Sequence, residues 1–486
     1  MKILFINLPY KFDISRASRW PEKTKSGTQY YPYWICYAAG VCMERGYEVE
    51  LVDCIAKKMT TKQTVQLVRD SAPDFVMGEI TTSTCAHDYK VLNAIKKYNP
   101  KVHIIIGGTH ATVLSKQVLE ECKAIDVVVR QEYDFTLDEV MQNWDNLSDI
   151  QGITYRDKDK KIIIQPDRPW TEDLDSLPMV SKVYEQFLNV NDYCYAFAQK
   201  PMIQVFSSRG CPFRCNFCSY PESMSGRRFR RRSVKNFVDE LEYIHKHMPY
   251  IREIFIEDDT FTVDKKRVVE ICDEIKRRKL KIVWSCNTRA DTLDYATMER
   301  MKDAGCRLLV VGYESGNQKV LDETHKGIKL EQSEIFAKNA KRLGLKVFGC
   351  FMIGLKGDNL STIEETFRFA KKLYPDMVFF QQAVPFPGTA FYAWAKENGY
   401  LRTEDYSKWL NQDGYLNCLV DYPYADHKQI EKIRDNLMSR YYFSFTYIFK
   451  TFLANLDWFE FKRVMKGGFT YIWFRIKKAG KQKRSH

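Results

Sequence analysis

The stretch that decides the fold is Cys211-Pro-Phe-Arg-Cys215-Asn-Phe-Cys218, which stands directly after an expected strand at residues 203–206. Its three cysteines are separated by three and then two residues, so one short loop can bring three soft thiolates around a single iron-sulfur cluster. A cluster of four irons needs four ligands, and three cysteines leave one iron open. The spacing predicts a [4Fe-4S] cluster held by Cys211, Cys215 and Cys218, with one coordination position left for another molecule.

A structural zinc site is the alternative for this loop. Zinc sites usually pair two short Cys motifs or complete the ligand set with histidine. The nearest downstream histidines, His245 and His247, fall in an expected helix well beyond the loop. The spacing and the strand-loop-helix context favour the iron-sulfur cluster, and zinc or a chance grouping of cysteines stays open as the alternative.

Apolar, β-rich runs alternate with helical patterns on either side of this loop. Strands are expected at residues 203–206, 253–256, 282–285, 308–312, 347–353 and 377–381. Gly305 and Gly344 follow helical stretches, where a left-handed C-cap is expected. These six β/α units within residues 196–400 predict a partial (β/α)6 barrel of the TIM type. Barrels of this kind carry their catalytic groups at the carboxyl ends of the strands.

The N-terminal part of the chain shows a second α/β pattern. Strands are expected at residues 3–8, 47–52, 75–80, 102–106 and 125–129, with helical stretches between them. This alternation predicts a doubly wound, Rossmann-like parallel sheet over residues 1–150, with its ligands beyond the carboxyl ends of the strands. A hairpin and a linker are expected at residues 151–195, and a helical, aromatic and basic region at residues 401–486.

Composition and charge narrow the class of protein. The chain has 486 residues, of which 45% are hydrophobic and 28% charged, as in ordinary globular proteins. It contains no run of eighteen apolar residues and no signal-peptide pattern, so we expect a cytoplasmic protein with reduced cysteines. The stretch from Arg440 to His486 carries eleven Lys or Arg against two acids and supplies most of the net charge of +13. Because the remainder is nearly neutral, no nucleic-acid partner is expected.

The cysteine loop after the first barrel strand resembles the radical S-adenosylmethionine (SAM) superfamily, whose usual aromatic residue beside the last cysteine is matched by Phe217. The resemblance covers roughly residues 202–400 and implies that SAM binds the open iron and is cleaved to a 5′-deoxyadenosyl radical. An α/β domain before such a barrel is similar to the cobalamin-binding (B12-dependent) subgroup, which includes methylases and the hopanoid-pathway and porphyrin-cyclase members. The implied cofactors are a [4Fe-4S] cluster, SAM and cobalamin, with an external electron donor of the flavodoxin or ferredoxin type.

Polar and glycine residues at the expected strand ends of the barrel are the candidates for SAM binding. The resemblance places the following residues around SAM: Phe217, Asp258, Asp259, Arg289, Glu314 and Gly354. Carboxylates after the second strand would accept from the SAM ammonium group, Arg289 would reach the ribose or the methionine carboxylate, and Glu314 lies in a Glu-Ser-Gly stretch similar to that of cobalamin-type members. Helix-capping acids and a structural salt bridge of Arg289 are the alternatives.

Small and hydroxyl side chains end the expected strands of the N-terminal sheet. The candidates for cobalamin contacts are Pro9, Thr82, Ser83, Gly107, Gly108 and Thr109. They lie at the carboxyl edge, where the nucleotide tail of a corrin would bind. The Asp-x-His-x-x-Gly motif that supplies a cobalt-ligating histidine in some B12 proteins is absent, so His110 is interpreted as a structural histidine. A sheet that binds no corrinoid is the alternative.

Two basic features complete the pattern. The first is an arginine run after the cysteine loop, which either anchors an anionic substrate group or pairs with acids such as Glu222; it comprises Arg227, Arg228, Arg230, Arg231 and Arg232. The second is the stretch 441–474, in which fourteen aromatic residues alternate with basic ones. One helical face is expected to hold Tyr441, Phe445, Ile448, Phe449 and Phe452. This face either makes peripheral contact with the inner face of the membrane or caps the barrel.

The combined pattern predicts a radical SAM enzyme that modifies an unactivated carbon, with C-methylation of a small or lipid-like substrate as the expected reaction. Radical cyclisation or ring contraction in lipid, hopanoid or tetrapyrrole biosynthesis is the alternative chemistry, and Tyr30-Tyr-Pro-Tyr-Trp34 resembles a stretch of the hopanoid-type members. A binding module in which a metal only stabilises the loop is the alternative of another class, and it predicts no SAM cleavage.

Overall fold

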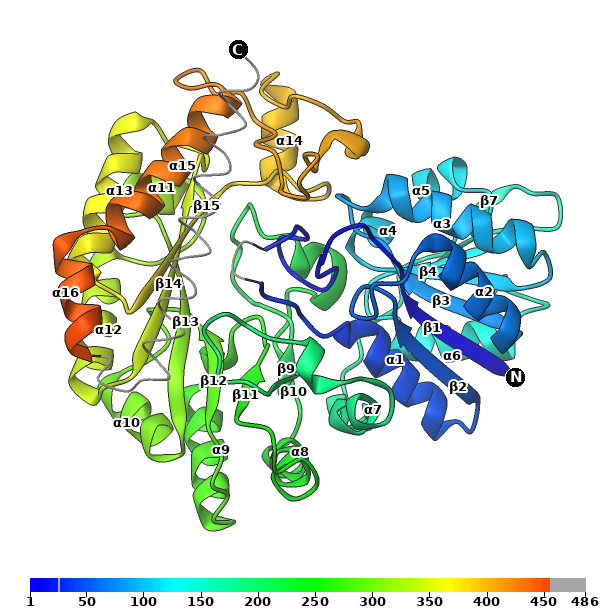
Figure 1. Cartoon of the computed structure of the whole chain (residues 1–486), viewed down its shortest axis with the longest axis horizontal. Coiled ribbons are helices and arrows are strands. Elements are labelled where there is room, and N and C mark those ends of the chain that lie inside the picture. The colour runs from blue at the N-terminus through cyan, green and yellow to red at the C-terminus, as the bar shows by residue number, and fades with distance from the viewer. Residues whose placement is uncertain (25–26, 455–486) are drawn as a thin grey trace.

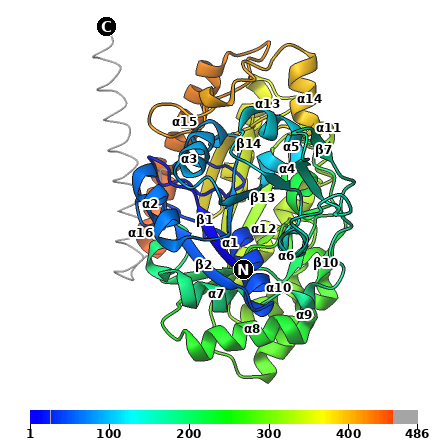
Figure 2. The ribbon, with the colours of Figure 1, turned by 90° about the vertical axis from the view of Figure 1, so that its right-hand side faces the viewer.

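The computed structural model describes residues 1–24 and 27–454. It contains two open sheets side by side, with the chain between β1 and α1 running between them (Figure 1). Viewed from the side of the first sheet, the strands β13 and β14 of the second sheet stand behind it (Figure 2). The helical, aromatic and basic region expected at residues 401–486 is described only as far as residue 454, and its part at residues 455–486 lies outside the described residues.

The first sheet has seven strands in the order β2-β1-β3-β4-β5-β6-β7. They are β1 (Lys2–Asn7), β2 (Glu48–Asp53), β3 (Phe75–Glu79), β4 (His103–Gly107), β5 (Val127–Val129), β6 (Ile153–Arg156) and β7 (Ile162–Ile164). The strands β1 to β5 pair in parallel, as their apolar runs predicted. The expected hairpin is formed by β6 and β7, and β6 pairs antiparallel with β5. The sheet therefore continues into the stretch that the sequence pattern presents as a separate hairpin and linker.

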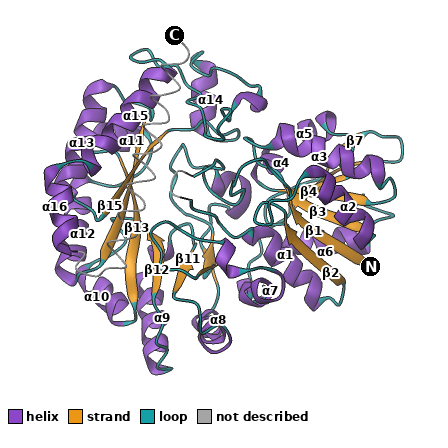
Figure 3. Ribbon diagram, in the orientation of Figure 1, coloured by secondary structure: helices purple, strands orange, loops and turns teal. Residues whose placement is uncertain are grey.

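Alternation of side chains along each strand divides the apolar residues of this sheet between two faces. In β1, Ile3 and Phe5 belong to the core beneath α1 and α6, whereas Leu4 and Ile6 belong to the core beneath α2, α3 and α5. These helices are α1 (Tyr33–Glu44), α2 (Thr61–Ser71), α3 (Cys85–Tyr98), α5 (Ser115–Glu121) and α6 (Asp134–Gln142). Helical cover on both faces is what a parallel sheet with buried strands requires (Figure 3).

The second sheet has six parallel strands in the order β8-β11-β12-β13-β14-β15. They are β8 (Met202–Val205), β11 (Glu253–Ile256), β12 (Trp284–Thr288), β13 (Cys306–Glu314), β14 (Lys346–Ile353) and β15 (Met377–Gln382). The outer face carries α8 (Val234–His247), α9 (Lys265–Arg277), α10 (Tyr295–Asp303), α11 (Gln318–Glu323), α12 (Leu330–Leu343) and α13 (Leu360–Leu373). Because β8 and β15 each have one neighbour in this sheet, the barrel is open, and the predicted partial (β/α)6 barrel is confirmed.

Residues 9–32, here called the connector, join β1 to α1 and touch both sheets. On the side of the first sheet, Ser83 donates from Oγ to the backbone oxygen of Pro21 at 2.6 Å. On the side of the barrel, the backbone N–H of Tyr31 donates to Oε1 of Gln204 at 2.8 Å. The connector therefore fixes how the two sheets sit against each other.

The C-terminal region is helical in part. It contains α14 (Ala390–Glu397), α15 (His427–Tyr442) and α16 (Phe445–Ala454), and between α14 and α15 the chain is irregular apart from the 3-10 turn η5 (Tyr406–Lys408). Trp409 and Leu416 of this irregular stretch belong to the core beneath α2, α3 and α5, and Tyr442 of α15 donates from Oη to the oxygen of Val378 in β15 at 2.7 Å. The region thus spans both domains.

The prediction that Tyr441 and the aromatic residues after it share one helical face is wrong. Tyr441 is buried at 1% exposure, whereas Phe445 is 82% exposed. The reason is that α15 ends at Tyr442 and α16 begins at Phe445, which interrupts the helical periodicity. Among the described residues, no helix combines the length and apolar character needed to cross a membrane.

Candidate active site

The cysteine loop is held in place by the barrel around it. The backbone N–H of Cys211 donates to the oxygen of Gly226 at 3.1 Å, and the N–H of Asn216 donates to the oxygen of Thr324 at 3.1 Å. Gly210, just before the loop, has φ +89°, and a Cβ there would stand 2.0 Å from the backbone oxygen of Arg228. Only glycine fits this close backbone approach, which turns the chain from β9 (Ser208–Arg209) into the loop.

The three thiols lie at the carboxyl end of β8 and β9 and are largely withdrawn from solvent. Burial raises the pKa of Cys218 to about 12, and it also raises the pKa of Cys211. The charge of Cys215 adds to both rises, so the thiols lie close enough to influence one another. Thiols bind a metal centre as thiolates, so binding releases their protons.

The donor set fits an iron-sulfur cluster better than zinc. In the described part of the chain, no three His, Cys, Asp or Glu side chains come close enough to hold one metal ion. A zinc site gathers four ligands within about 2.0–2.3 Å of a single ion, whereas a cluster spreads its thiolates over several irons. One buried and two partly buried thiols without histidine suit an iron-sulfur cluster, and the role of Cys211, Cys215 and Cys218 as its ligands stays a prediction.

Three consecutive carboxylates follow β11, and each has a different environment. Asp258 accepts from the N–H of Ser207 at 2.7 Å and from its Oγ at 2.6 Å, and also from Oγ of Ser208 at 2.5 Å, so it ties the ends of β8 and β11 together. Asp259 forms an ion pair with Arg19 of the connector at 2.7 Å. Glu257 accepts from Gln204 Nε2 at 2.9 Å, and burial raises its pKa to about 7.

Arg289 reaches the cysteine loop from the end of β12. Its Nη1 lies 4.0 Å from Sγ of Cys215, and its guanidinium stands over the ring of Phe213 at 3.5 Å from the centroid. The same side chain pairs with Asp291 at 2.9 Å. The structural salt bridge therefore exists, and it holds the guanidinium beside the loop where a SAM-binding role for Arg289 is predicted.

Glu314 ends β13 with φ +63° and pairs with Lys326 at 2.8 Å. Both side chains are at most 10% exposed, and the charge of Glu314 holds the pKa of the Lys326 ammonium above its usual range. A Cβ at Gly312 would stand 2.4 Å from Oε1 of Glu314, so this glycine makes room for the pair. The pair lies on the barrel rim beside the cysteine loop.

Phe217 and Gly354 are the two remaining candidates for SAM contacts. Phe217 is partly buried and packs against the main core. Gly354 follows β14 with φ +77°, and its backbone oxygen accepts from the hydroxyl of Tyr422. A Cβ at Gly354 would stand 2.6 Å from that hydroxyl, so the C-terminal region covers this glycine directly. Roles of both residues in SAM binding stay predictions.

The cobalamin candidates line the carboxyl edge of the first sheet, as predicted from their position after its strands. Pro9 is buried beside β1, and Thr109 opens α4 (Thr109–Val113). Gly108 has φ +102°, and a Cβ there would stand 2.7 Å from the oxygen of Ile80, while Gly107 lies against the ring of Tyr133. The helix α4 contacts the short π-helical turn η3 (Pro221–Ser225), which follows the cysteine loop. The two predicted cofactor regions therefore face one another.

His110 has the environment of a structural histidine. Its Nδ1 lies 3.2 Å from Oγ1 of Thr82, and its Nε2 lies 3.4 Å from the hydroxyl of Tyr89. Burial lowers its pKa to about 4, so the ring is neutral near pH 7. Both nitrogens are already engaged, and the ring of Tyr406 packs edge-on against it with 5.0 Å between centroids.

The arginine run pairs with carboxylates, in agreement with the second interpretation of its sequence. Arg230 pairs with Glu132 at 2.6 Å, and both side chains are 2% exposed. The other pairs are Arg227 with Glu222, Arg228 with Glu172, Arg231 with Asp264 and Arg232 with Glu240. Since Glu132 belongs to the first domain, Arg230 links the two domains, and the carboxylate partners of the run do not favour its role as an anchor for an anionic substrate.

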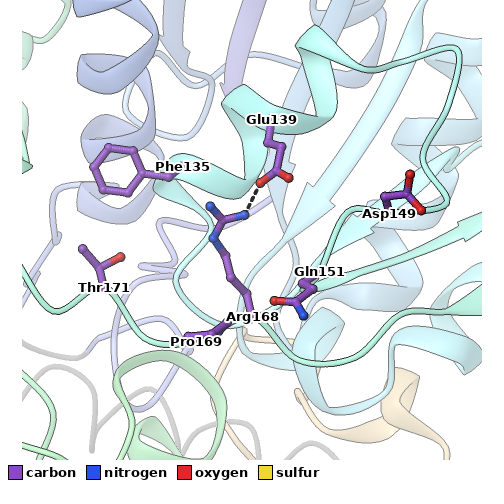
Figure 4. Close-up of a pocket in the computed structure, with 7 residues that line it drawn as sticks. All are labelled: Phe135, Glu139, Asp149, Gln151, Arg168, Pro169 and Thr171. Carbon is purple, nitrogen blue, oxygen red and sulfur yellow. Dashed lines mark hydrogen bonds and ion pairs between the residues drawn. The ribbon is translucent and has the colours of Figure 1, made fainter.

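A surface pocket of about 390 Å³ is lined by residues of the first domain and of the linker that follows it. Figure 4 shows Arg168 directed at Glu139 within it, and the two form an ion pair. Phe135, Asp149, Gln151, Pro169 and Thr171 complete its lining. None of the predicted cofactor residues borders it, so we do not assign the reaction to this pocket.

Two positively charged residues of the site have no signal in the sequence pattern. Arg19 comes from the connector, and Lys326 follows α11 in a short turn. Neither stands at a strand end, which is the signal that identified Asp259, Arg289 and Glu314. A lone basic residue in a loop has no periodicity or spacing that would single it out.

Comparison with protein families gives two matches within this chain. The model of the radical SAM superfamily matches residues 205–370, and that of the B12 binding domain matches residues 23–141. The first match contains the cysteine loop and the barrel strands β11 to β14, and the second contains most of the first sheet with its hydroxyl-lined edge.

Individual proteins agree with these matches. An uncharacterized methyltransferase of Pyrococcus horikoshii is 32% identical over 96% of this chain and 98% of its own length. The anaerobic magnesium-protoporphyrin IX monomethyl ester cyclase of Rubrivivax gelatinosus is 28% identical over 80% of this chain and 68% of its own length.

The fold is also found in a solved structure. The radical SAM methyltransferase TsrM of Kitasatospora setae, with cobalamin and a [4Fe-4S] cluster bound, superposes with a TM-score of 0.67 at 16% identity over 83% of this chain and 79% of its own. The chain described here belongs to the cobalamin-binding branch of the radical SAM superfamily, and its cofactors are a [4Fe-4S] cluster, SAM and cobalamin.

Proposed function

We propose that this enzyme is a C-methyltransferase that acts on an unactivated carbon of a small or lipid-like substrate. The observation that carries the proposal is the meeting of the two cofactor edges: α4 of the first domain contacts η3 beside the cysteine loop. When bound, the cluster and cobalamin supply the radical chemistry and the methyl carrier. The methyltransferase relative that spans nearly the whole chain supports methylation over cyclisation.

The residues of the chain have three tasks in this proposal. Cys211, Cys215 and Cys218 hold the cluster and leave one iron for SAM. Asp259, Arg289 and Glu314 surround SAM with fixed charges, each already oriented by a partner. Phe217, Asp258 and Gly354 shape the same rim, and the hydroxyl-lined edge of the first sheet holds the corrin.

The side chains on the concave face of the barrel favour a substrate with an apolar portion. Its strands β13, β14 and β15 leave Val310, Phe348, Cys350 and Phe379 partly exposed on this face, whereas the residues that alternate with them are buried against the outer helices. Partly exposed apolar side chains beside a paired set of charges suit a substrate with a hydrocarbon portion, because burying that portion is favourable.

Isotope transfer tests the proposal. The enzyme is purified without oxygen, loaded with iron, sulfide and hydroxocobalamin, and incubated with a reductant of the flavodoxin type and SAM labelled with deuterium in its methyl group. Extract from a strain that lacks the enzyme supplies the substrate. We expect 5′-deoxyadenosine together with a product that carries the labelled methyl group. A product without the label would favour cyclisation or ring contraction, and absence of 5′-deoxyadenosine would favour the binding module.

We propose, as a second point, that α16 and the basic stretch after it bind an anionic membrane surface. Phe443, Phe445, Ile448 and Phe449 are each 48% exposed or more, and Phe445 stacks on Phe449 with 6.0 Å between ring centroids. The sequence from Arg440 to His486 has eleven cationic residues against two acids. Exposed aromatics beside cationic residues match the headgroup region of an anionic bilayer.

Cosedimentation with vesicles tests this surface. We expect binding to vesicles that contain phosphatidylglycerol, weak binding to neutral phosphatidylcholine vesicles, and loss of binding in Phe445→Ser/Phe449→Ser. Ile335→Ser is the matched control, because Ile335 is 59% exposed but lies on α12. Equal sedimentation of the double variant and the intact protein would contradict the proposal and indicate that other parts of the chain cover the aromatic residues.

A further inference from the structure

Arg19 of the connector crosses from the first domain to the rim of the barrel. Its Nη2 lies 2.7 Å from Oδ1 of Asp259, a residue 240 positions later in the chain. The Arg19 side chain is 28% exposed and the Asp259 side chain 7%. The ion pair therefore sits between the domains, largely shielded from water, where charges interact more strongly than at the surface.

Several contacts fix the position of this guanidinium. It stands over the ring of Tyr220 at 4.6 Å from the centroid, and Asp259 accepts a second hydrogen bond from Oγ of Ser225 at 2.6 Å. The backbone oxygen of Ala17, two positions before Arg19, accepts from the hydroxyls of both Tyr33 and Tyr220. The connector is thus anchored to the barrel both at Ala17 and at Arg19.

The pair borders the cysteine loop on two sides. Tyr220, beneath the guanidinium, is two positions after Cys218, and Thr260, next to Asp259, has its Oγ1 3.9 Å from Sγ of Cys211. A fixed positive charge from the first domain therefore acts on the place where the cluster is to be held.

We propose that Arg19 is a positioning residue through which the cobalamin-binding domain raises the reduction potential of the iron-sulfur cluster. The inference rests on the cluster ligation proposed above. A nearby positive charge stabilises an added electron, so a cluster beside Arg19 accepts one electron from the external donor more readily than it would without it. Asp259, with its negative charge, limits the effect, and the connector keeps both charges at the loop only while the two domains are docked.

The test uses the full-length enzyme loaded with iron and sulfide, and reads the potential instead of activity. Arg19→Met, Arg19→Lys, Asp259→Asn and the double variant Arg19→Met/Asp259→Asn are compared by redox titration followed with electron paramagnetic resonance. Arg231→Met is the matched control, since Arg231 also pairs with a carboxylate of the barrel, Asp264, but is 55% exposed. Iron and sulfide content are measured in each variant.

We expect the Arg19 and Asp259 variants to shift the midpoint potential of the cluster in opposite directions. Arg19→Met shifts the midpoint potential to more negative values, Asp259→Asn shifts it to more positive values, and the double variant returns toward the unmodified enzyme. Arg19→Lys and Arg231→Met stay near the unmodified potential. Equal potentials in all fully loaded variants would overturn the proposal, as would shifts of the same sign or loss of iron in Arg19→Met and Arg19→Lys alike. An unmodified enzyme that binds no cluster would instead refute the ligation itself, and this inference with it.

Discussion

The carboxyl edges of the two sheets differ sharply in charge. The barrel rim carries Asp259, Arg289, Glu314 and Lys326, all in ion pairs around the cysteine loop. After β3 and β4 the edge of the first sheet carries hydroxyl groups and glycines, and the ion pair between Arg16 and Asp88, at 2.6 Å, is fully enclosed. The further ion pairs of this edge, such as Arg230 with Glu132, follow β5.

This difference corresponds to the chemistry of the two ligands. SAM has an ammonium, a carboxylate and a sulfonium, and a rim of paired charges can exchange partners with such a molecule without leaving a buried charge alone. A corrin presents mostly amide groups and a bulky ring, for which close backbone approach and neutral hydrogen-bonding groups suffice. Two sheets that both contain parallel strands are therefore specialised by the residues at the carboxyl ends of those strands.

The largest expected effect is loss of the cluster at the barrel rim while the edge of the first sheet still binds cobalamin. Cys215→Ala removes a thiol that is 8% exposed at the centre of the loop. We expect loss of the cluster and of 5′-deoxyadenosine formation, because two thiolates cannot hold a four-iron centre, while cobalamin still binds to the first domain. Iron analysis and cobalamin absorbance measure the two effects. Cys272→Ala, at a buried cysteine of α9, is the control. Iron content unchanged in Cys215→Ala would contradict the assignment.

Most of the framework that carries these edges could be predicted from sequence. Strands buried on both faces appear as apolar runs, and the run expected at 347–353 is β14 (Lys346–Ile353) in the structure. Gly344 ends α12 with φ +67°, as its place after the helical pattern predicted. Residues that follow a strand could be placed at an edge for the same reason, which is why Arg289 and Glu314 were found.

The contacts between domains could not be predicted in this way. Arg19 and the C-terminal Trp409 lie in stretches without periodicity, and their positions depend on packing against elements far away in the chain. The pairing of β6 with β5 was missed because an antiparallel hairpin has the same alternation whether or not it joins a sheet. Sequence pattern gives the elements and their edges, whereas tertiary packing decides which edges meet.

The second prediction tests the edge of the first sheet alone. Gly108→Ala places a Cβ 2.7 Å from the oxygen of Ile80 at φ +102°. We expect about 1–3 kcal/mol of strain, consistent with a residue forced into this backbone region, and cobalamin affinity reduced at least tenfold. Cluster content stays unchanged. Absorbance titration with hydroxocobalamin and thermal unfolding measure the two effects.

Gly46→Ala is the matched control for this variant, because Gly46 has φ +79° but a Cβ added there would meet no other atom within 4 Å. It carries the backbone strain without the clash and lies away from the carboxyl edge. Equal cobalamin affinity in Gly108→Ala and Gly46→Ala would show that the shape of the edge at Gly108 does not matter for the corrin.

The third prediction concerns the charge balance of the barrel rim. Lys326→Met leaves the carboxylate of Glu314 buried without its partner, and we expect SAM affinity to fall about tenfold, or ~1.4 kcal/mol. Lys326→Arg keeps the charge and restores most of the affinity. Lys356→Met is the control, since Lys356 pairs with Glu323 but is 41% exposed. Equilibrium binding of SAM to the loaded enzyme with its cluster oxidised, so that SAM is not cleaved, distinguishes them, and equal affinity in Lys326→Met and the unmodified protein would contradict this role.

The smallest expected effect belongs to Glu79, at the end of β3 on the neutral edge. Tyr133 donates to its Oε1 at 2.8 Å, and burial raises its pKa from 4.5 to about 7. Because the folded protein binds a proton that the unfolded chain has released, Glu79 lowers the free energy of unfolding progressively as pH rises from 4.5 to 7. A neutral glutamine keeps the acceptor and removes this loss.

Glu79→Gln should therefore gain stability over the unmodified protein as pH increases, by about 1 kcal/mol between pH 6 and pH 7. Denaturant unfolding at both pH values measures the gain, and Glu120→Gln, at a carboxylate whose side chain is 53% exposed, is the control. The same pH dependence in Glu79→Gln and the unmodified protein would mean that the carboxylate is ionised without cost. The edge of the first sheet would then tolerate charge as the barrel rim does, and its neutrality would no longer explain why the corrin belongs there.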